Sequence, residues 1–174
     1  MEPLSQPRRE EVLADYRRMR EKMRPLLSKI LASLDREAFQ EAGCRLGILK
    51  GDTLRIDSED AVVVLMDFAI RHVRRRGVNA IEQYRAAVQP APDSEEARLL
   101  EMIAGARYRL LQIGRVYRGL GVEVQDLLRK EENLLVDVNM SLCASSGAVL
   151  AGDCYTFGEF WTTTGASLPC DWDT

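Results

Sequence analysis

The sequence predicts an α+β protein in which an N-terminal helical part is followed by a small antiparallel β-sheet or open β-barrel. Two observations predict this order. Apolar residues recur at steps of three and four as far as residue 104, which is the period of helices that pack on a core. From Tyr108 onward the chain consists of short runs rich in β-branched and aromatic residues, separated by Gly, Asn and Asp.

The same change of pattern suggests how the chain is divided. We predict a helical part over residues 1–90, a linker with one helix over 91–107, and a β-rich part over 108–174. Pro90 and Pro92 mark the linker. At 174 residues the chain is also short enough for these parts to form one continuous domain.

A single apolar stripe runs along the first predicted helix. Its members alternate at steps of four and three residues: Val12, Tyr16, Met19, Met23, Leu26 and Ile30. Pro25 lies inside this pattern and lacks the N–H that a helix interior needs, so we predict a break or a bend there. The stripe can pack on the chain's own helices or on a second copy or another partner. In the latter case the candidate contact residues are Val12, Tyr16, Met19 and Met23.

The next two helices are marked by their caps. Asp35 can cap a helix that ends before a turn at residues 49–53, and Ser58, followed by two acidic residues, can cap another over residues 61–73. The latter is apolar on nearly every side, so we predict that it is central and buried. Its three consecutive valines leave a strand as the alternative.

Two more helices precede the β-rich part. Asn79 with Glu82 three residues later resembles a capping box, and it opens a helix that ends before Gln89. Asp93 or Ser94 can cap the last helix, which fades near residue 105.

The β-rich part shows the alternation of half-buried strands. Val122 and Val124 alternate with polar residues, and the next run places Leu134, Val136 and Val138 on one face. The Gly-Leu-Gly sequence at 119–121 is typical of a hairpin turn, because no helix and no phosphate-binding pattern follows it. Four or five such strands would form a small curled sheet or open barrel, whose mouth or open face is a common binding surface.

Composition places the chain among ordinary globular proteins. Apolar residues make up 46% and charged residues 29%, and the net charge of −3 favours neither nucleic acid nor strongly cationic partners. The longest apolar run, Ala61 to Met66, is far too short to cross a membrane, and the first residues resemble no signal or transit peptide. We therefore expect a cytoplasmic protein with reduced cysteines and no membrane partner.

No local pattern marks a metal or catalytic site. Cys143, Cys154 and Cys170 lack the close pairs of a zinc site, so we expect no metal and no cofactor. His72 is the single histidine and has no nucleophile marked beside it. These results favour a protein that is not an enzyme.

Nucleic-acid binding is the alternative with the most sequence support. The basic run offers Arg71, Arg74, Arg75 and Arg76 for phosphate contacts. The β-rich part offers rings for base stacking: Tyr155, Phe157 and Trp161. These rings lie in the most acidic part of the chain, however, so rings in a core and solvated arginines are the competing interpretation.

Residues 106–165 also resemble a known group of sequences. The shared features are Gly119 and Gly121 at the turn, an Asp-Leu-Leu step at 126–128 and a Gly-Asp pair at 152–153. This segment resembles one found in uncharacterised bacterial proteins, some of which carry a cysteine-rich zinc motif called SEC-C. The SEC-C motif is absent from this sequence. The resemblance therefore implies no zinc site and no activity.

We expect a non-catalytic protein-interaction or regulatory module of a bacterial protein, which binds another protein or itself. The alternative is a single-stranded nucleic-acid-binding protein that uses the C-terminal β part with the basic run 71–76 as a rim. An enzyme centred on His72 or Cys154 ranks third, because only a dispersed active site would leave no local motif.

Overall fold

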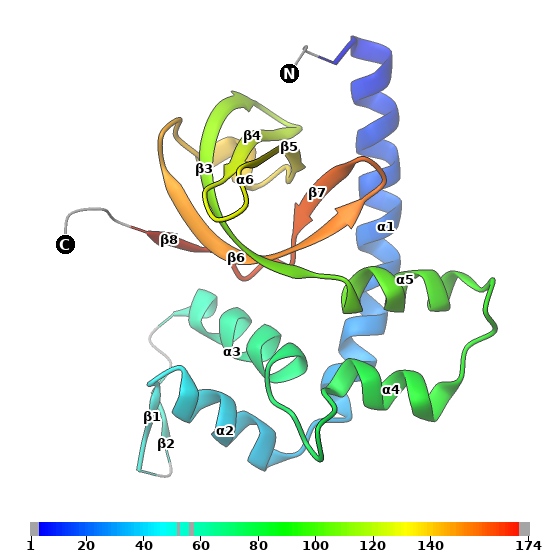
Figure 1. The fold of residues 1–174 in the computed structure, drawn as a ribbon, viewed down its shortest axis with the longest axis vertical. Coiled ribbons are helices and arrows are strands. Elements are labelled where there is room, and N and C mark those ends of the chain that lie inside the picture. The colour runs from blue at the N-terminus through cyan, green and yellow to red at the C-terminus, as the bar shows by residue number, and fades with distance from the viewer. Residues whose placement is uncertain (1–3, 52, 56–57, 171–174) are drawn as a thin grey trace. The chain divides into compact units, whose positions relative to one another are not determined.

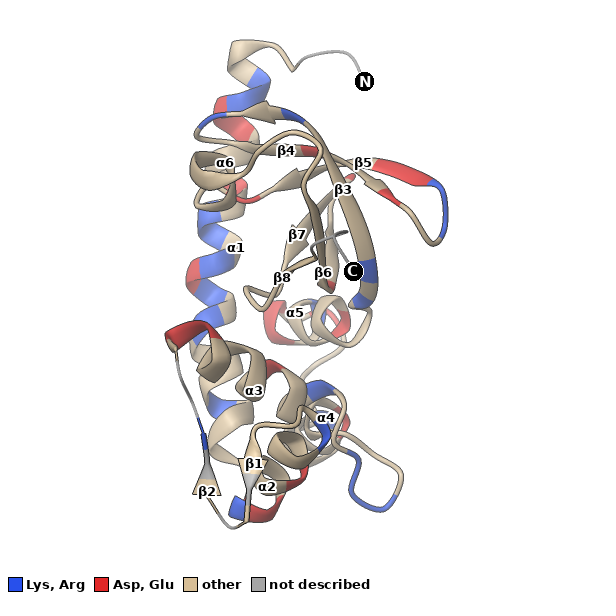
Figure 2. Cartoon of the chain, turned by 90° about the vertical axis from the view of Figure 1, so that its left-hand side faces the viewer, with Lys and Arg blue, Asp and Glu red and all other residues tan. Residues whose placement is uncertain are grey.

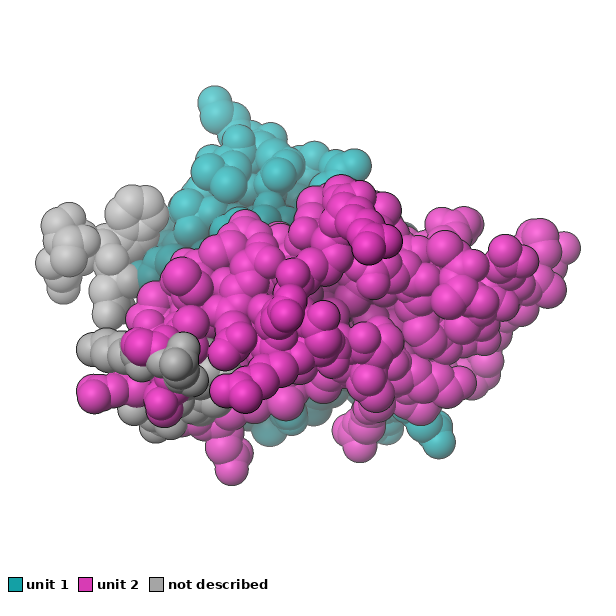
Figure 3. Space-filling model, turned by 90° about the horizontal axis from the view of Figure 1, so that it is seen from below, with its two compact units in different colours: residues 1–21, 105–174 teal, residues 22–104 magenta. Residues whose placement is uncertain are grey.

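The computed structural model describes residues 4–51, 53–55 and 58–170 and forms two compact units (Figure 3). Unit 1 comprises residues 1–21 and 105–174, and unit 2 comprises residues 22–104. Unit 1 contains a β-barrel and unit 2 is mainly helical (Figure 1), which confirms the α+β class with helices before strands. The first 21 residues group with the barrel, although the sequence assigned them to the helical part. None of the described helices is long and apolar enough to cross a membrane.

Helix α1 (Gln6–Ala32) is continuous, so of the break or bend predicted at Pro25 the break is wrong. All six members of its apolar stripe are buried. Met23 and Leu26, on either side of Pro25, are 1% and 5% exposed, and this packing holds the helix together where the proline removes one hydrogen bond.

The first part of α1 belongs to unit 1 and packs on its barrel. Arg20 donates a hydrogen bond to the carbonyl oxygen of Thr163 at 3.3 Å, and Arg8 forms an ion pair with Glu159 at 2.7 Å. Burial, reinforced by the nearby carboxylate of Asp137, raises the pKa of Tyr16 above its ordinary value.

Unit 2 begins with the predicted capped helices. Helix α2 (Arg36–Arg45) starts after Asp35, whose carboxylate accepts a hydrogen bond from the Ala38 amide at 2.8 Å, and α3 (Glu59–Arg71) starts after Ser58. Between them, β1 (Leu49–Lys50) and β2 (Thr53–Leu54) form a short antiparallel hairpin at the predicted turn.

Helices α2 and α3 share a core. Its buried members are Ala38, Ala42, Leu65, Ala69 and Val73. Helix α3 nevertheless exposes Val63 and Met66, so it is buried on one side only, and the prediction of a central, buried helix is wrong in this respect. A helix at the edge of a small core needs only one apolar face.

Helices α4 (Ala80–Val88) and α5 (Glu95–Ala104) complete unit 2. Asn79 and Glu82 form both hydrogen bonds of the predicted capping box, at 2.9 and 2.7 Å. The hydroxyl of Ser94 accepts a hydrogen bond from the Ala97 amide at 3.1 Å, so Ser94 caps α5.

The strands of unit 1 form a closed barrel. They are β3 (Arg107–Tyr117), β4 (Gly121–Asp126), β5 (Glu131–Val136), β6 (Val149–Phe157) and β7 (Phe160–Thr163). Their order is β3-β4-β5-β7-β6, and β6 pairs back with β3. All neighbours are antiparallel except β5 and β7, which form one parallel pair at Leu135 and Trp161. Strand β8 (Leu168–Cys170) adds to the first half of β6, and helix α6 (Met140–Cys143) lies between β5 and β6 in the chain.

This connectivity is that of an OB-fold barrel. Three strands follow one another, a helix comes next, and the last strand of the barrel inserts between the third and the fourth. Strand β3 pairs with both β4 and β6, and its register shifts between Ile113 and Val116, which bends it around the barrel. OB-folds commonly bind ligands over their second and third strands, which here are β4 and β5.

The barrel interior is mainly apolar. Its core members are Leu111, Ile113, Val122, Val124, Leu135, Leu150, Cys154 and Trp161, and Met140 of α6 packs against them. All three residues at the end of β5, Leu134 to Val136, are buried. Strand β5 is therefore covered on both faces there, and the predicted alternation fails because the sequence does not show that a second layer covers this strand.

Candidate functional site

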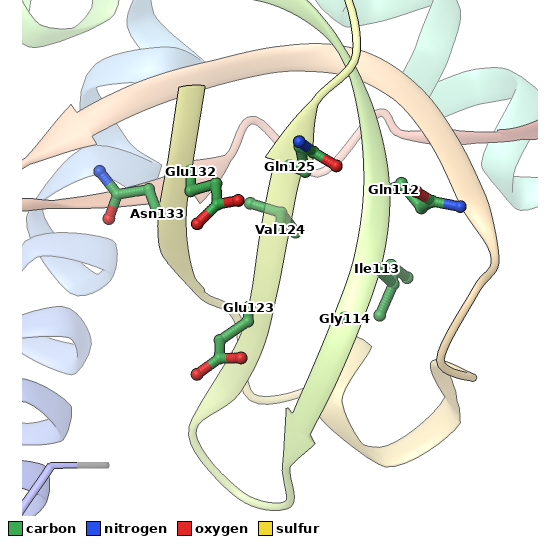
Figure 4. Close-up of a pocket in the computed structure, with 8 residues that line it drawn as sticks. All are labelled: Gln112, Ile113, Gly114, Glu123, Val124, Gln125, Glu132 and Asn133. Carbon is green, nitrogen blue, oxygen red and sulfur yellow. The ribbon is translucent and has the colours of Figure 1, made fainter. Parts of the chain in front are cut away.

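A groove of about 210 Å³ lies on the outer face of strands β3, β4 and β5 (Figure 4). Its lining residues are Gln112, Ile113, Gly114, Glu123, Val124, Gln125, Glu132 and Asn133. The groove therefore occupies the strands over which OB-folds commonly bind their ligands.

Strand register brings the polar side chains of the groove together. Gln112 lies opposite Gln125, and Gln125 lies opposite Glu132, so the three side chains form a row on one face of the sheet. Gly114 lies next to Glu123, and a Cβ atom there would be 3.5 Å from the Cβ of Glu123. The missing side chain at Gly114 leaves the floor of the groove open.

The lining of the groove is acidic and polar. Glu123 and Glu132 are its charged residues, and both are carboxylates. The Tyr117 hydroxyl donates a hydrogen bond to Glu123 at 2.6 Å, which raises the pKa of Tyr117. In the described part of the chain, the side chains of Gln112, Gln125 and Glu132 have no hydrogen-bond or ion-pair partner. Their polar atoms are therefore available to a ligand.

A buried ion-pair network lies on the inner side of the same strands. Arg109 of β3 is 4% exposed and donates to Asp126 of β4 at 2.8 Å and to Glu131 of β5 at 2.7 Å. Its guanidinium carbon lies 3.6 Å from the centre of the Trp161 ring on β7, a cation–π contact. The network thus ties four strands together.

Asp126 is the fully buried member of this network. Burial pushes its pKa upward, but hydrogen bonds from the Leu128 amide, from Arg129 and from Arg109 together hold the pKa of Asp126 below its ordinary value. The carboxylate is therefore charged and fully engaged. It stabilises the barrel and is closed to a ligand.

Comparison with known proteins adds one result. The family of unknown function DUF7986 matches residues 10–172. The chain belongs to this family. No curated protein and no solved structure matches the chain. The match covers nearly the whole sequence and both units of the DUF7986 fold.

The rings predicted to stack on bases are mostly buried in this DUF7986 chain. Tyr155 is 0% exposed and Trp161 is 6% exposed, while Phe157 is half-buried. A base stacks only on a ring that solvent can reach. Tyr155 and Trp161 therefore pack the barrel, as the competing interpretation of the sequence holds.

The predicted phosphate-binding arginines differ in their surroundings. Arg71 is buried, forms an ion pair with Asp67 at 2.8 Å and donates to the carbonyl oxygen of Ile103 at 2.8 Å. It therefore stabilises unit 2. Arg74 is exposed and lies 3.4 Å from Glu82.

A second hollow lies beside the end of this basic run. It has a volume of about 460 Å³ and is lined by Asp35, Arg75, Arg76, Val78 and Gln83. Arg75 forms ion pairs with Asp35 at 3.5 Å and with Glu37 at 3.4 Å. The positive charge at this hollow is therefore partly neutralised.

The helix stripe proposed for a partner is covered within the chain itself. Val12, Tyr16, Met19 and Met23 are each at most 8% exposed. The structure thus uses the stripe for packing inside one chain, the first of the two alternatives that the sequence left open.

The four cysteines differ in how far they are exposed to solvent. All four are free thiols, with Cys44 and Cys143 exposed and Cys154 buried. Burial, together with the nearby carboxylates of Asp153 and Asp126 and despite Arg109, raises the pKa of Cys154 to about 12. Among the described residues, no three His, Cys, Asp or Glu side chains are placed to share a metal ion.

Sequence reasoning missed the groove. The alternation around Val122 and Val124 correctly placed Glu123 and Gln125 on the outer face of a strand. Neither Glu132 nor Gln112 was singled out as a site residue. Only the register of β3, β4 and β5 brings these residues together, and register between strands is not visible in one sequence.

Proposed function

We propose that this DUF7986 protein is a non-catalytic binding module, with an interaction or regulatory role, that holds a protein partner through the groove on β3, β4 and β5. One observation carries the proposal: a hollow whose lining includes the unpaired side chains of Gln112, Gln125 and Glu132 lies on the strands over which OB-fold barrels commonly bind their ligands.

The size of the groove supports a macromolecular partner. Sites for small molecules and cofactors typically measure about 300 to 1,000 Å³. A volume of about 210 Å³ is smaller and suits a single side chain of a larger molecule. Such a side chain would act as an anchor, while the rest of the partner contacts the surrounding strands.

The proposal also includes the location, the origin and the relatives that we expect from the sequence. A cytoplasmic location, a bacterial origin and a relation to proteins with SEC-C motifs rest on the sequence alone. The lack of a membrane-spanning helix among the described residues is compatible with the location.

The proposal is tested by placing a photo-crosslinking amino acid in the full chain at Gln125, inside the groove, or at Thr156, an exposed control position on β6. We expect crosslinks to a protein partner from position 125 and not from position 156. The captured partner, once purified, should bind the wild-type chain and bind Gly114→Leu, which fills the groove, about tenfold more weakly. Equal crosslinking at both positions, or equal binding by Gly114→Leu, would contradict the proposal.

The second candidate is single-stranded nucleic-acid binding through the barrel and the arginine run. The OB-fold topology and the exposed Arg74 and Arg76 favour it. The acidic groove and the buried rings of Tyr155 and Trp161 count against it, because phosphates need cations and bases need exposed rings.

Fluorescence anisotropy with short single-stranded and duplex DNA and RNA tests this candidate. Binding to single strands that weakens steeply with salt, and that Arg74→Glu with Arg75→Glu abolishes, would establish it. Arg17→Glu with Arg18→Glu, on the exposed side of α1, makes the same charge change elsewhere and should leave the binding intact. Absence of binding at low salt would eliminate this candidate.

A further inference from the structure

We propose that the groove on β3, β4 and β5 receives the cationic side chain of a lysine or arginine from an extended segment of the partner. This inference deepens the proposed function and rests on it, since it names the chemistry of the partner at the same site. It is carried by the charge, the hydrogen-bonding groups and the shape of the groove.

Charge is the first argument. The two charged residues in the groove lining, Glu123 and Glu132, are both acidic, and the lining contains no Lys or Arg. Figure 2 shows acidic residues at the start of β5. The turn between β4 and β5 carries basic residues. A cation in the groove would therefore meet two carboxylates and gain charge-assisted hydrogen bonds, whereas an anion would be repelled.

No arginine among the described residues forms an ion pair with Glu123 or Glu132. Arg129, in the turn before β5, donates to the fully buried Asp126 at 3.1 Å and to the carbonyl oxygen of Tyr108 at 3.0 Å. Arg115 donates to the hydroxyl of Tyr117 at 3.5 Å. The carboxylate of Glu132 has no partner among the described residues, so its charge is available to an incoming cation.

Hydrogen-bonding capacity is the second argument. A lysine ammonium group has three donors, an arginine guanidinium has five, and neither has an acceptor. The groove offers matching acceptors, because Gln125 carries a side-chain carbonyl oxygen next to the carboxylate of Glu132, and Gln112 adds another on the far side of Gln125 (Figure 4). The three residues lie in one row across β3, β4 and β5, so one charged group can reach several of them.

Shape is the third argument. Lysine and arginine have long apolar stems that pack along apolar surface while the charged end stays among polar groups. The methylene groups of Gln112, Gln125 and Glu132 can pack along such a stem, and the absent side chain of Gly114 gives the groove depth. The volume of about 210 Å³ is suited to one such side chain.

The test uses nuclear magnetic resonance on the full, ¹⁵N-labelled chain. The probe is a short peptide of alternating lysine and serine, and the matched control is the same peptide with every lysine acetylated, which removes the charge. We expect the lysine peptide to shift the side-chain amide signals of Gln112 and Gln125, and the acetylated peptide to leave them unchanged.

Variants assign the effect to the two carboxylates. Glu132→Gln and Glu123→Gln should each weaken binding of the lysine peptide roughly two- to fivefold, as expected for exposed ion pairs. Glu21→Gln removes the same charge from the exposed side of α1 and should not change the affinity. Far-ultraviolet circular dichroism checks that each variant is folded.

Several outcomes would overturn the inference. They are equal shifts with the acetylated peptide, unchanged affinity in both groove variants, and shifts of the same signals by calcium ions without any effect of the peptide. If crosslinking from Gln125 still captures a partner in such a case, the binding module remains and only its preference for a cation is wrong. If neither experiment detects binding at the groove, both proposals fail.

Discussion

At the scale of single residues, Gly121 shows most directly how closely the barrel strands approach. A Cβ atom at this position would lie 2.0 Å from the carbonyl oxygen of Leu135 and 2.9 Å from the Cα of Val136, both in β5. Gly121→Ala should therefore push β4 and β5 apart and destabilise the protein by about 3 kcal/mol or more. Gly114→Ala is the matched control, because its Cβ would meet Glu123 at an ordinary 3.5 Å. Urea unfolding followed by circular dichroism measures both variants, and equal midpoints would contradict this close approach.

Asp126 gives a prediction that depends on pH. Its pKa is lower in the folded chain than the ordinary value of 3.8, so its contribution to the free energy of unfolding is complete above that value. The contribution is lost as the pH falls through the lower pKa of the folded state. We expect the stability of the wild type to fall between about pH 4 and pH 2, and Asp126→Asn to show a smaller fall. An unchanged fall in Asp126→Asn would assign the acid sensitivity to another carboxylate.

The two ion pairs of Arg109, one with Asp126 and one with Glu131, allow a buried ion pair to be compared with an exposed one. Asp126→Asn leaves Arg109 without its fully buried partner and should cost about 3 to 5 kcal/mol near neutral pH. Glu131→Gln removes the other partner of Arg109, but the Glu131 side chain is 45% exposed, so we expect a loss below about 1 kcal/mol. Urea unfolding of the two variants in one buffer makes the comparison, and similar losses would refute the distinction.

At the scale of elements, Pro25 is the exception to the helix rules. The proline is exposed in the middle of α1 and costs the helix one backbone hydrogen bond. Pro25→Ala restores the donor but makes the unfolded chain more flexible, so we expect a net gain of about 2 kcal/mol. Thermal unfolding by circular dichroism should show a higher Tm. A lower Tm would mean that the proline ring itself contributes essential packing.

The elements also show which features one sequence can predict. The caps Asp35, Ser58 and Asn79 were predicted correctly, because a cap is a contact between residues two or three positions apart. The row formed by Gln112, Gln125 and Glu132 was not, because it depends on how three strands align. Helix starts are local chemistry, whereas the groove arises from long-range pairing.

At the scale of the whole molecule, the sequence predicts the order of elements along the chain but not how they group in space. The sequence correctly predicted helices first and a barrel last. It did not predict that the chain crosses between the two units inside α1, because a regular apolar stripe looks the same whatever covers it. The prediction that the rings of Tyr155 and Trp161 stack on bases failed for a similar reason. An aromatic residue in a short strand suits a core and a binding face equally well, so the sequence does not distinguish the two.

The shared helix leads to a prediction about cooperativity. Met19 belongs to unit 1 and Met23 to unit 2, yet both are buried members of one uninterrupted helix, one turn apart. Met23→Ala opens a cavity that should cost about 2 to 5 kcal/mol, and loss of the helix in unit 2 should also weaken α1 where it packs on the barrel. We therefore expect faster hydrogen exchange in β3 and β4 of the variant, although the substitution lies in the other unit. Lys29→Ala, at an exposed position of α1, should leave exchange in the barrel unchanged. If β3 and β4 keep their wild-type exchange rates in Met23→Ala, the barrel unfolds independently and α1 does not couple the two units.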